Sequence, residues 1–255
     1  MSAFFEFYSN FFGSRWESLR LALSEKNCST KLQFDETLAP YFLDEASVFA
    51  AKALDVKPGM QVLDMCAAPG GKTLILASAL SGEGSLQCND RSNDRRERLA
   101  HVIENTLPES WRKIISISGY DGNKFGRYKK ETFDKILLDA PCSSERHVLN
   151  SEEHLKVWTK NRIKRLSVEQ GSLLASAIDA LKPGGEVVYS TCALTPFEND
   201  AVVEKILKKR AGLLEIISLT PKFKGTEITK YGLSMLPDYC EGRGPIFCAK
   251  LKKKI

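Results

Sequence analysis

The stretch that decides the fold runs from residue 61 to residue 73 and reads Gln61-Val62-Leu63-Asp64-Met65-Cys66-Ala67-Ala68-Pro69-Gly70-Gly71-Lys72-Thr73. Residues 61–65 predict a β-strand, and small residues with two glycines follow at once. Such a loop lets a ligand approach the backbone closely. The helix expected over 71–80 offers free N–H groups and the positive end of its dipole. We therefore expect a strand, a ligand-binding loop and a helix here.

Strand-like and helix-like segments alternate from residue 56 to the end of the chain. Apolar, β-branched runs predict strands over 61–65, 85–89, 114–118, 134–138, 186–191, 213–218 and 245–251. Amphipathic segments predict helices over 71–80, 92–106, 160–181 and 197–209. This alternation indicates an α/β domain over 56–255, with a Rossmann-like, mostly parallel sheet of seven strands and helices on both faces. No strong helix separates the last two strands, so we expect the final strand to be antiparallel.

Residues 1–55 predict a short helical extension in front of this domain. Phe4, Tyr8, Phe12 and Trp16 recur every fourth residue, which places them on one face of a helix over 4–24. We expect this face to pack onto the main domain rather than to stack on bases. A second helix is expected over 40–54.

Composition narrows the class of protein. The 255 residues are 43% hydrophobic and 27% charged, as in soluble globular proteins, and no apolar run reaches the roughly 18 residues of a membrane span. The seven cysteines form no CxxC pair, which argues against a zinc site or any other metal, and their odd number favours a reducing cytoplasm. The net charge of +5 leans mildly toward polyanions. The basic stretch 146–165 is either a solvated helix face or a polyanion-binding surface, and the lysine-rich run 250–254 reads as a solubilising tail.

Three acids follow the ends of successive predicted strands, namely Asp90, Asp121 (which precedes Gly122) and Asp139. Ligands of doubly wound sheets bind at the carboxyl ends of the strands, and an acid about 20 residues after the glycine loop suits a ribose diol. We therefore expect these acids and the loop to line one pocket. A P-loop needs glycine where this chain has Cys66, and no GxGxxG is present, so a phosphate loop is not expected.

Two cysteines stand at the ends of strands that we expect to be neighbours. Cys142 ends Asp139-Ala140-Pro141-Cys142, and Cys192 ends Tyr189-Ser190-Thr191-Cys192. Both thiols should open onto one cleft. Cytosine methylation at C5 gives a reason for a thiol, because a thiolate that adds to C6 activates C5, and an acid near N3, such as Asp139, can share a proton with the ring.

These motifs closely resemble those of the RsmB/Nop/Sun family of RNA cytosine-5 methyltransferases. The matching segments are 64–73 for the cofactor motif, 139–144 for motif IV and 190–194, followed by Glu198-Asn199, for motif VI. Segments 11–20 and 41–47 resemble the branch that methylates small-subunit RNA of mitochondrial ribosomes. The resemblance implies a class I S-adenosyl-L-methionine-dependent methyltransferase that forms 5-methylcytosine, with ribosomal RNA expected ahead of transfer RNA.

The resemblance also implies residue roles. It makes Cys192 the nucleophile, gives Cys142 a part in product release, and lets Lys72 face the cytosine, where the chemistry of the ring already places Asp139. The implied cofactor-binding positions are Cys66, Ala67, Ala68, Pro69, Gly70, Gly71, Lys72, Asp90, Arg95, Asp121, Gly122 and Asp139.

The expected partner is RNA, and because we expect no separate RNA-binding domain, the ribosomal subunit or a helper protein would position the enzyme. Two other interpretations stay open. One is a class I methyltransferase for proteins or small molecules, which has no use for the two thiols. The other is a non-catalytic RNA-binding assembly factor.

Overall fold

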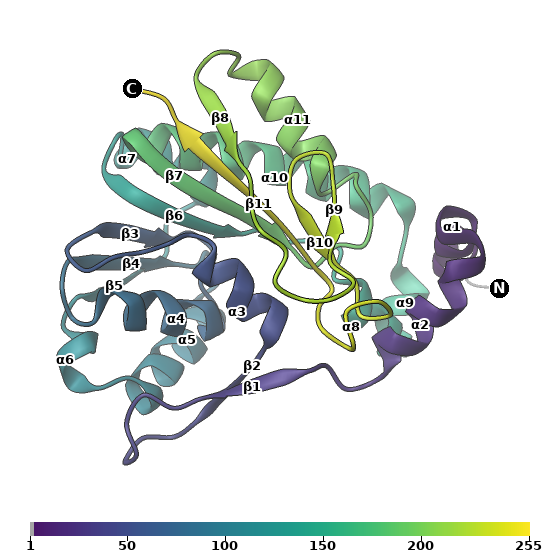
Figure 1. Ribbon diagram of the computed structural model, residues 1–255, viewed down its shortest axis with the longest axis horizontal. Helices are drawn as coiled ribbons and strands as arrows, with labels where there is room; N and C mark the ends of the chain where they lie inside the picture. The colour runs from purple at the N-terminus through teal and green to yellow at the C-terminus, as the bar shows by residue number, and fades with distance from the viewer. Residues whose placement is uncertain (1–2) are drawn as a thin grey trace.

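The computed structural model describes residues 3–255 and contains one large sheet (Figure 1). Its strands are β3 (Gln61–Asp64), β4 (Ser85–Asn89), β5 (Ile115–Ser118), β6 (Phe133–Asp139), β7 (Leu181–Thr191), β8 (Leu214–Ile217), β9 (Glu227–Ile228), β10 (Leu233–Met235) and β11 (Ile246–Lys253). The seven expected strands are confirmed. The two short strands β9 and β10 were not expected, and they extend the sheet beyond β11.

The strand order is β5-β4-β3-β6-β7-β11-β10-β9, and β8 also pairs with β11. The five strands from β5 to β7 are parallel, whereas β11 runs antiparallel to β7. The order reverses at β3, because the chain passes first to β4 on one side and later to β6 on the other. Ligands of open α/β sheets bind at such a switch point, beyond the carboxyl ends of the strands.

Helices cover both faces of the sheet (Figure 1). One face packs on α3 (Glu45–Lys52), α4 (Gly71–Leu80) and α5 (Asn93–Thr106), and the other on α7 (Phe125–Tyr128), α10 (Lys160–Ala180) and α11 (Asp200–Lys209). Successive strand residues alternate between these two cores, as a pleated strand requires. Val62 belongs to the first core and Leu63 to the second, and Leu137 and Leu138 divide in the same way.

The prediction of a single helix over 4–24 is wrong, because the helix is interrupted. The chain forms α1 (Ala3–Phe12), a 3-10 turn over Gly13–Arg15 and α2 (Trp16–Ser24). Gly13 has a φ of 56°, a left-handed value that no α-helix continues through. The predicted packing of the aromatic face is confirmed, because Phe4, Tyr8 and Trp16 are buried in a third cluster with Trp158.

The predicted helix over 40–54 begins too early. Its first residues form β2 (Tyr41–Asp44), which pairs antiparallel with β1 (Ser29–Leu32). The Asp44 carboxylate accepts the N–H groups of Ala46 and Ser47, and this cap starts α3 at Glu45. The predicted extension therefore holds a hairpin as well as helices. Residues 1 and 2 lie outside the described part of the chain, and a boundary at residue 55 stays a prediction.

Three further elements differ from expectation. The strand predicted over 186–191 begins earlier, because the segment 182–185 already belongs to β7, with an irregular register opposite β6. The basic stretch 146–165 contains α8 (Glu145–Leu149), α9 (Glu152–Val157) and the start of α10 rather than one helix face. The lysine run is not a tail, because Lys250 and Lys253 are buried in β11 and pair with Glu186 and Glu131.

The remaining short elements are α6 (Glu109–Arg112) and the 3-10 turn η2 (Gly122–Lys124), which connect strands at the edge of the sheet. No helix within residues 3–255 combines the length and the apolar character needed to cross a membrane.

Candidate active site

Two cavities adjoin at the carboxyl ends of the central strands. The larger has a volume of about 590 Å³ and contains both strand-end cysteines, and the smaller, of about 360 Å³, lies beside Asp90 and Asp121. Both are large enough for a small ligand. Residues common to the two linings are Cys66, Arg95 and Pro141. A ligand in the small cavity therefore lies next to one in the large cavity.

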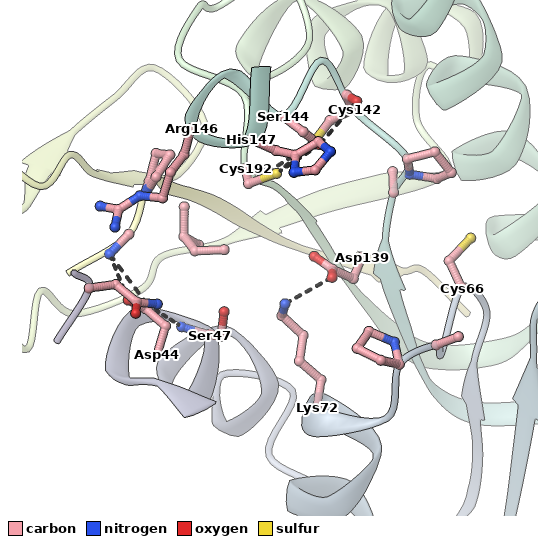
Figure 2. Close-up of a pocket in the computed structure, with 18 of the residues that line it drawn as sticks. Asp44, Ser47, Cys66, Lys72, Asp139, Cys142, Ser144, Arg146, His147 and Cys192 are labelled. Carbon is pink, nitrogen blue, oxygen red and sulfur yellow. Dashed lines mark hydrogen bonds and ion pairs between the residues drawn. The ribbon is translucent and has the colours of Figure 1, made fainter. Parts of the chain in front are cut away.

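The predicted meeting of the two thiols is confirmed. β6 and β7 are parallel neighbours with Asp139 opposite Ser190, so the loops that follow them start side by side. The Sγ atoms of Cys142 and Cys192 are 2.8 Å apart at one wall of the larger cavity (Figure 2). Cys142 is buried, whereas Cys192 is partly exposed to that cavity.

The two thiols differ in acidity. The hydrogen bond between them raises the pKa of Cys142 well above its usual value, and burial raises it further. The same bond lowers the pKa of Cys192, although burial opposes the change. The Ser144 hydroxyl lies 3.4 Å from the sulfur of Cys192 and 3.5 Å from that of Cys142. Cys192 is thus the more accessible and the more acidic thiol, which suits a nucleophile.

Lys72 and Asp139 form the second polar group of this cavity. Lys72 Nζ donates to Asp139 Oδ2 at 2.8 Å, and the Ser190 hydroxyl donates to Asp139 Oδ1 at 2.8 Å. Burial alone would lower the pKa of Lys72, but the Asp139 carboxylate more than offsets it and the pKa is raised. The pair faces the cysteines across the cavity (Figure 2). The cavity is thus lined by the Lys72 ammonium, a positively charged donor, next to the Asp139 carboxylate, a negatively charged acceptor.

The glycines of the loop after β3 pack closely against neighbouring elements. A Cβ on Gly71 would lie 2.8 Å from Leu43 and 2.9 Å from Tyr41, both in β2. Gly70 has a φ of 121° and packs against α5. Within this loop, Cys66, Ala68, Pro69 and Lys72 line the larger cavity, whereas Ala67, Gly70 and Gly71 line neither cavity. The predicted cofactor contacts of these last three residues stay a prediction.

The smaller cavity fits the predicted adenosine-type cofactor. Asp90 is 4% exposed, and while its Oδ1 accepts the Ser92 N–H, its Oδ2 makes no hydrogen bond, though Arg95 lies 3.2 Å away. A buried acceptor of this kind suits a ribose hydroxyl. Asp121 and Gly122 line the same cavity, and the Asn123 amide lowers the pKa of Asp121. Met65 and Leu173 supply apolar walls for a flat ring.

Sequence reasoning missed several residues of the larger cavity. Asp44 and His147 line it, as do Ser144 and Arg146. Arg146 donates to the Glu25 carbonyl oxygen at 3.1 Å, and burial lowers the pKa of its guanidinium. Asp44 lay inside the helix predicted over 40–54, and Arg146 stood out only as a basic residue of the stretch 146–165.

Comparison with known proteins agrees with this geometry. A family model described as 16S rRNA methyltransferase RsmB/F matches residues 51–252. The mouse mitochondrial tRNA (cytosine(34)-C(5))-methyltransferase is 37% identical over 84% of this chain and 63% of its own length. The 5-cytosine rRNA methyltransferase NSUN4 of Xenopus laevis is 35% identical over 93% of this chain and 61% of its own.

Among solved structures, NSun6 from Pyrococcus horikoshii superposes with a TM-score of 0.71 and 28% identity over 86% of this chain and 54% of that one. The chain thus spans about three fifths of the length of the curated relatives that it matches. Because the family model covers most of the chain, including both cysteine motifs, the chain belongs to the 16S rRNA methyltransferase RsmB/F family.

Proposed function

We propose that this protein is an S-adenosyl-L-methionine-dependent methyltransferase that forms 5-methylcytosine in RNA. The observation that carries the proposal is the pair of thiols, 2.8 Å apart, that faces the Lys72–Asp139 pair beside the smaller cavity. Methyl transfer to an amine or a hydroxyl has no use for two such thiols. Decay of the site, as expected of a non-catalytic assembly factor, is not seen in these four residues.

The small cavity supports the cofactor assignment. Cys66, Asp90, Arg95 and Asp121 would hold the cofactor there, and its sulfonium would supply an electrophilic methyl group at the boundary of the two cavities. The NSun6 structure, which is similar to this chain, was solved with SFG, an analogue of S-adenosylmethionine. The names of the mouse and Xenopus relatives support cytosine C5 as the acceptor.

Lys72 and Asp139 suit the edge of a cytosine. That edge carries the N4 amino donor next to the N3 and O2 acceptors, and a carboxylate can accept from N4 while an ammonium donates to N3 or O2. Uracil has an acceptor in place of the N4 donor, so its O4 would meet the Asp139 carboxylate unfavourably. A base inside a duplex cannot reach the cavity, so the target cytosine is single-stranded or flipped out.

The chain's own residues account for the covalent steps. The Cys192 thiolate adds to C6, an S–C6 bond forms, and the C5–C6 π electrons move into the ring while N3 gains a proton. We propose Lys72 as the donor in place of the Asp139 expected from the sequence, because Lys72 is the donor in its hydrogen bond with Asp139. C5 becomes nucleophilic and takes up the methyl group. Lys72 takes back the N3 proton, and transfer of the C5 proton to water then returns electrons to the C5–C6 bond and expels the Cys192 thiolate. Cys142, in contact with the nucleophile, is placed to assist this release.

Denaturing gels test the reaction and the two thiol roles. Wild-type protein, Cys142→Ala and Cys192→Ala are incubated with RNA and S-adenosylmethionine. We expect a covalent protein–RNA band with Cys142→Ala, where attack proceeds and release fails, and neither a band nor 5-methylcytosine with Cys192→Ala. A band with Cys192→Ala instead would reverse the roles. Absence of a band and of 5-methylcytosine in all three, on small ribosomal subunits as well as on free RNA, would sink the proposal.

Ribosomal RNA is the proposed substrate, and transfer RNA is the second candidate. The family description and the Xenopus relative's name favour ribosomal RNA, and the mouse relative's name favours transfer RNA. We propose that the small ribosomal subunit, or a helper protein, positions the target. Parallel assays on free transfer RNA, free ribosomal RNA and assembled small subunits distinguish the candidates by where 5-methylcytosine forms.

A further inference from the structure

A buried carboxylate connects the N-terminal helix to both cysteine-bearing loops. Glu145 is fully buried, and Oε1 accepts hydrogen bonds from the hydroxyls of Tyr8 and Ser143. Its Oε2 accepts the backbone N–H of Leu194 at 3.3 Å. The donors come from α1, from the loop after β6 and from the loop after β7, so one side chain joins three segments that are distant in sequence.

The contacts of Glu145 lie next to the reactive sulfurs. Ser143 directly follows Cys142, and Leu194 is two residues beyond Cys192. The two sulfur atoms are in contact only while both loops keep their spacing, and Glu145 is bonded to both loops. A fully buried carboxylate is costly unless hydrogen bonds satisfy it. Loss of one donor would therefore alter the position of the carboxylate and the contacts that it makes to the other two.

The Tyr8 hydroxyl is not needed to dock α1. Tyr8 is fully buried, but its ring already packs on Phe4, Trp16 and Trp158, with centroid distances of 4.6, 5.3 and 5.8 Å. Phe4 packs on Trp158 as well, at 5.4 Å. Phenylalanine at position 8 would keep these ring contacts. The hydroxyl contributes only its hydrogen bond to Glu145, which separates its effect on the loops from the docking of the helix.

We propose that Tyr8 is a positioning residue for the thiol pair: its hydroxyl orients the Glu145 carboxylate, which holds the loops 140–144 and 192–195 at the spacing that keeps Cys142 against Cys192. The proposal rests on the proposed function for its catalytic meaning. Its structural claim, that Tyr8 and Glu145 set the spacing of the two thiols, does not depend on the proposed reaction. The N-terminal helix α1 thus contributes to the active site through the hydrogen bond from Tyr8 to Glu145.

Alkylation of Cys192 tests the proposal without RNA or cofactor. The rate of carboxamidomethylation of Cys192 by iodoacetamide is measured against pH by peptide mass spectrometry. In the wild type the hydrogen bond with Cys142 lowers the pKa of Cys192. In Tyr8→Phe we expect the midpoint of this profile to rise by about one pH unit, and kcat for methylation to fall roughly tenfold with KM unchanged. An unchanged profile and an unchanged kcat would overturn the proposal.

Two further variants separate positioning from folding. Phe4→Leu loosens the same aromatic cluster but keeps the hydroxyl, so we expect a lower Tm and a wild-type alkylation profile. Ser143→Ala removes the other hydroxyl that donates to the same carboxylate oxygen, leaves α1 and the charge of Glu145 unchanged, and should raise the midpoint as Tyr8→Phe does. If Phe4→Leu shifts the profile as far as Tyr8→Phe, the hydroxyl has no specific role and the proposal fails.

The test also distinguishes failure of the proposed function from failure of this inference. If the wild type makes no 5-methylcytosine but Tyr8→Phe shifts the alkylation profile, the positioning role stands and the proposed reaction is wrong. If the wild type methylates RNA and Tyr8→Phe changes neither profile nor kcat, the reaction stands and Tyr8 is a packing residue only.

Discussion

At the scale of single residues, the backbone of Ser144 is unusual. Its φ of 54° is left-handed, which costs a residue with a side chain about 1–2 kcal/mol. This conformation lies two residues after Cys142 and brings the Ser144 hydroxyl within 3.5 Å of both sulfurs. Strain retained beside a reactive group indicates a functional role for the side chain. The serine hydroxyl adds a hydrogen bond that helps to keep the pKa of Cys192 low.

Substitutions of Ser144 test whether its strained backbone lowers the stability of the fold while its hydroxyl raises the reactivity of Cys192. Glycine removes both the strain and the hydroxyl, so Ser144→Gly should raise the free energy of unfolding by about 0.5–1 kcal/mol. It should also slow covalent adduct formation by roughly tenfold, about one pKa unit of thiol acidity. Ser144→Ala loses the hydroxyl but keeps the strain, so it should slow the adduct without stabilising the fold. Urea unfolding and gel-shift rates measure the two effects.

At the scale of elements, the hairpin of β1 and β2 closes over the start of α4. A Cβ on Gly71 would lie 2.8 Å from Leu43 and 2.9 Å from Tyr41, both in β2. The first turn of α4 carries Lys72, so this packing also sets the position of the lysine that pairs with Asp139. The hairpin thus supports the site from outside the central sheet.

A matched pair of glycine substitutions tests this packing. Gly71→Ala should lower the free energy of unfolding by about 1–2 kcal/mol, because Tyr41 and Leu43 must move, and should weaken binding of S-adenosylmethionine by shifting the loop. Gly171 lies in α10 with nothing within 4 Å of an added Cβ. Gly171→Ala should therefore stabilise the protein by about 0.5–1 kcal/mol and leave binding unchanged. Equal effects of the two substitutions in urea unfolding and calorimetric titration would contradict the packing argument.

At the scale of the whole molecule, two buried acidic side chains, Asp64 and Glu198, lie next to the active site. Asp64 at the end of β3 is 1% exposed, and burial raises its pKa to about 7. Burial, with the Glu145 carboxylate, raises the pKa of Glu198 to about 7 as well. Asp64 accepts a hydrogen bond from the Thr73 hydroxyl, next to Lys72, and Glu198 accepts the backbone N–H of Ser143, next to Cys142. Because both acids change protonation state near neutral pH, the free energy of unfolding depends on pH in that range.

The sign of the resulting pH dependence follows from linkage. The folded pKa of Asp64 lies above the unfolded value, so the stability it contributes is complete below about pH 4 and is lost as the pH rises through about 7. Asp64→Asn cannot ionise and keeps an oxygen for the Thr73 hydroxyl. We expect it to be more stable than the wild type at pH 8 by on the order of 3 kcal/mol, with little difference at pH 4. Urea midpoints at the two pH values measure this, and a variant less stable at pH 8 would refute it.

Local patterns in the sequence determined seven strands of the sheet and the polar residues and thiols at their ends. Strands such as 134–138 and helices such as 160–181 were predictable because each buries an apolar face whose spacing is set within the segment itself. Cys142, Cys192, Asp90, Asp121 and Asp139 were predictable because parallel neighbouring strands end at one edge of the sheet. The two-thiol cleft followed from that rule alone.

Tertiary contacts decided the rest. The segment 41–44 became a strand because 29–32 offered it a partner, although its residues read as the start of a helix. Gly71 is required by side chains from β2, and Tyr8 meets Glu145 across 137 positions of chain. Such contacts leave no periodic signal in the sequence, because each depends on where the chain returns in space and not on the spacing of neighbouring residues.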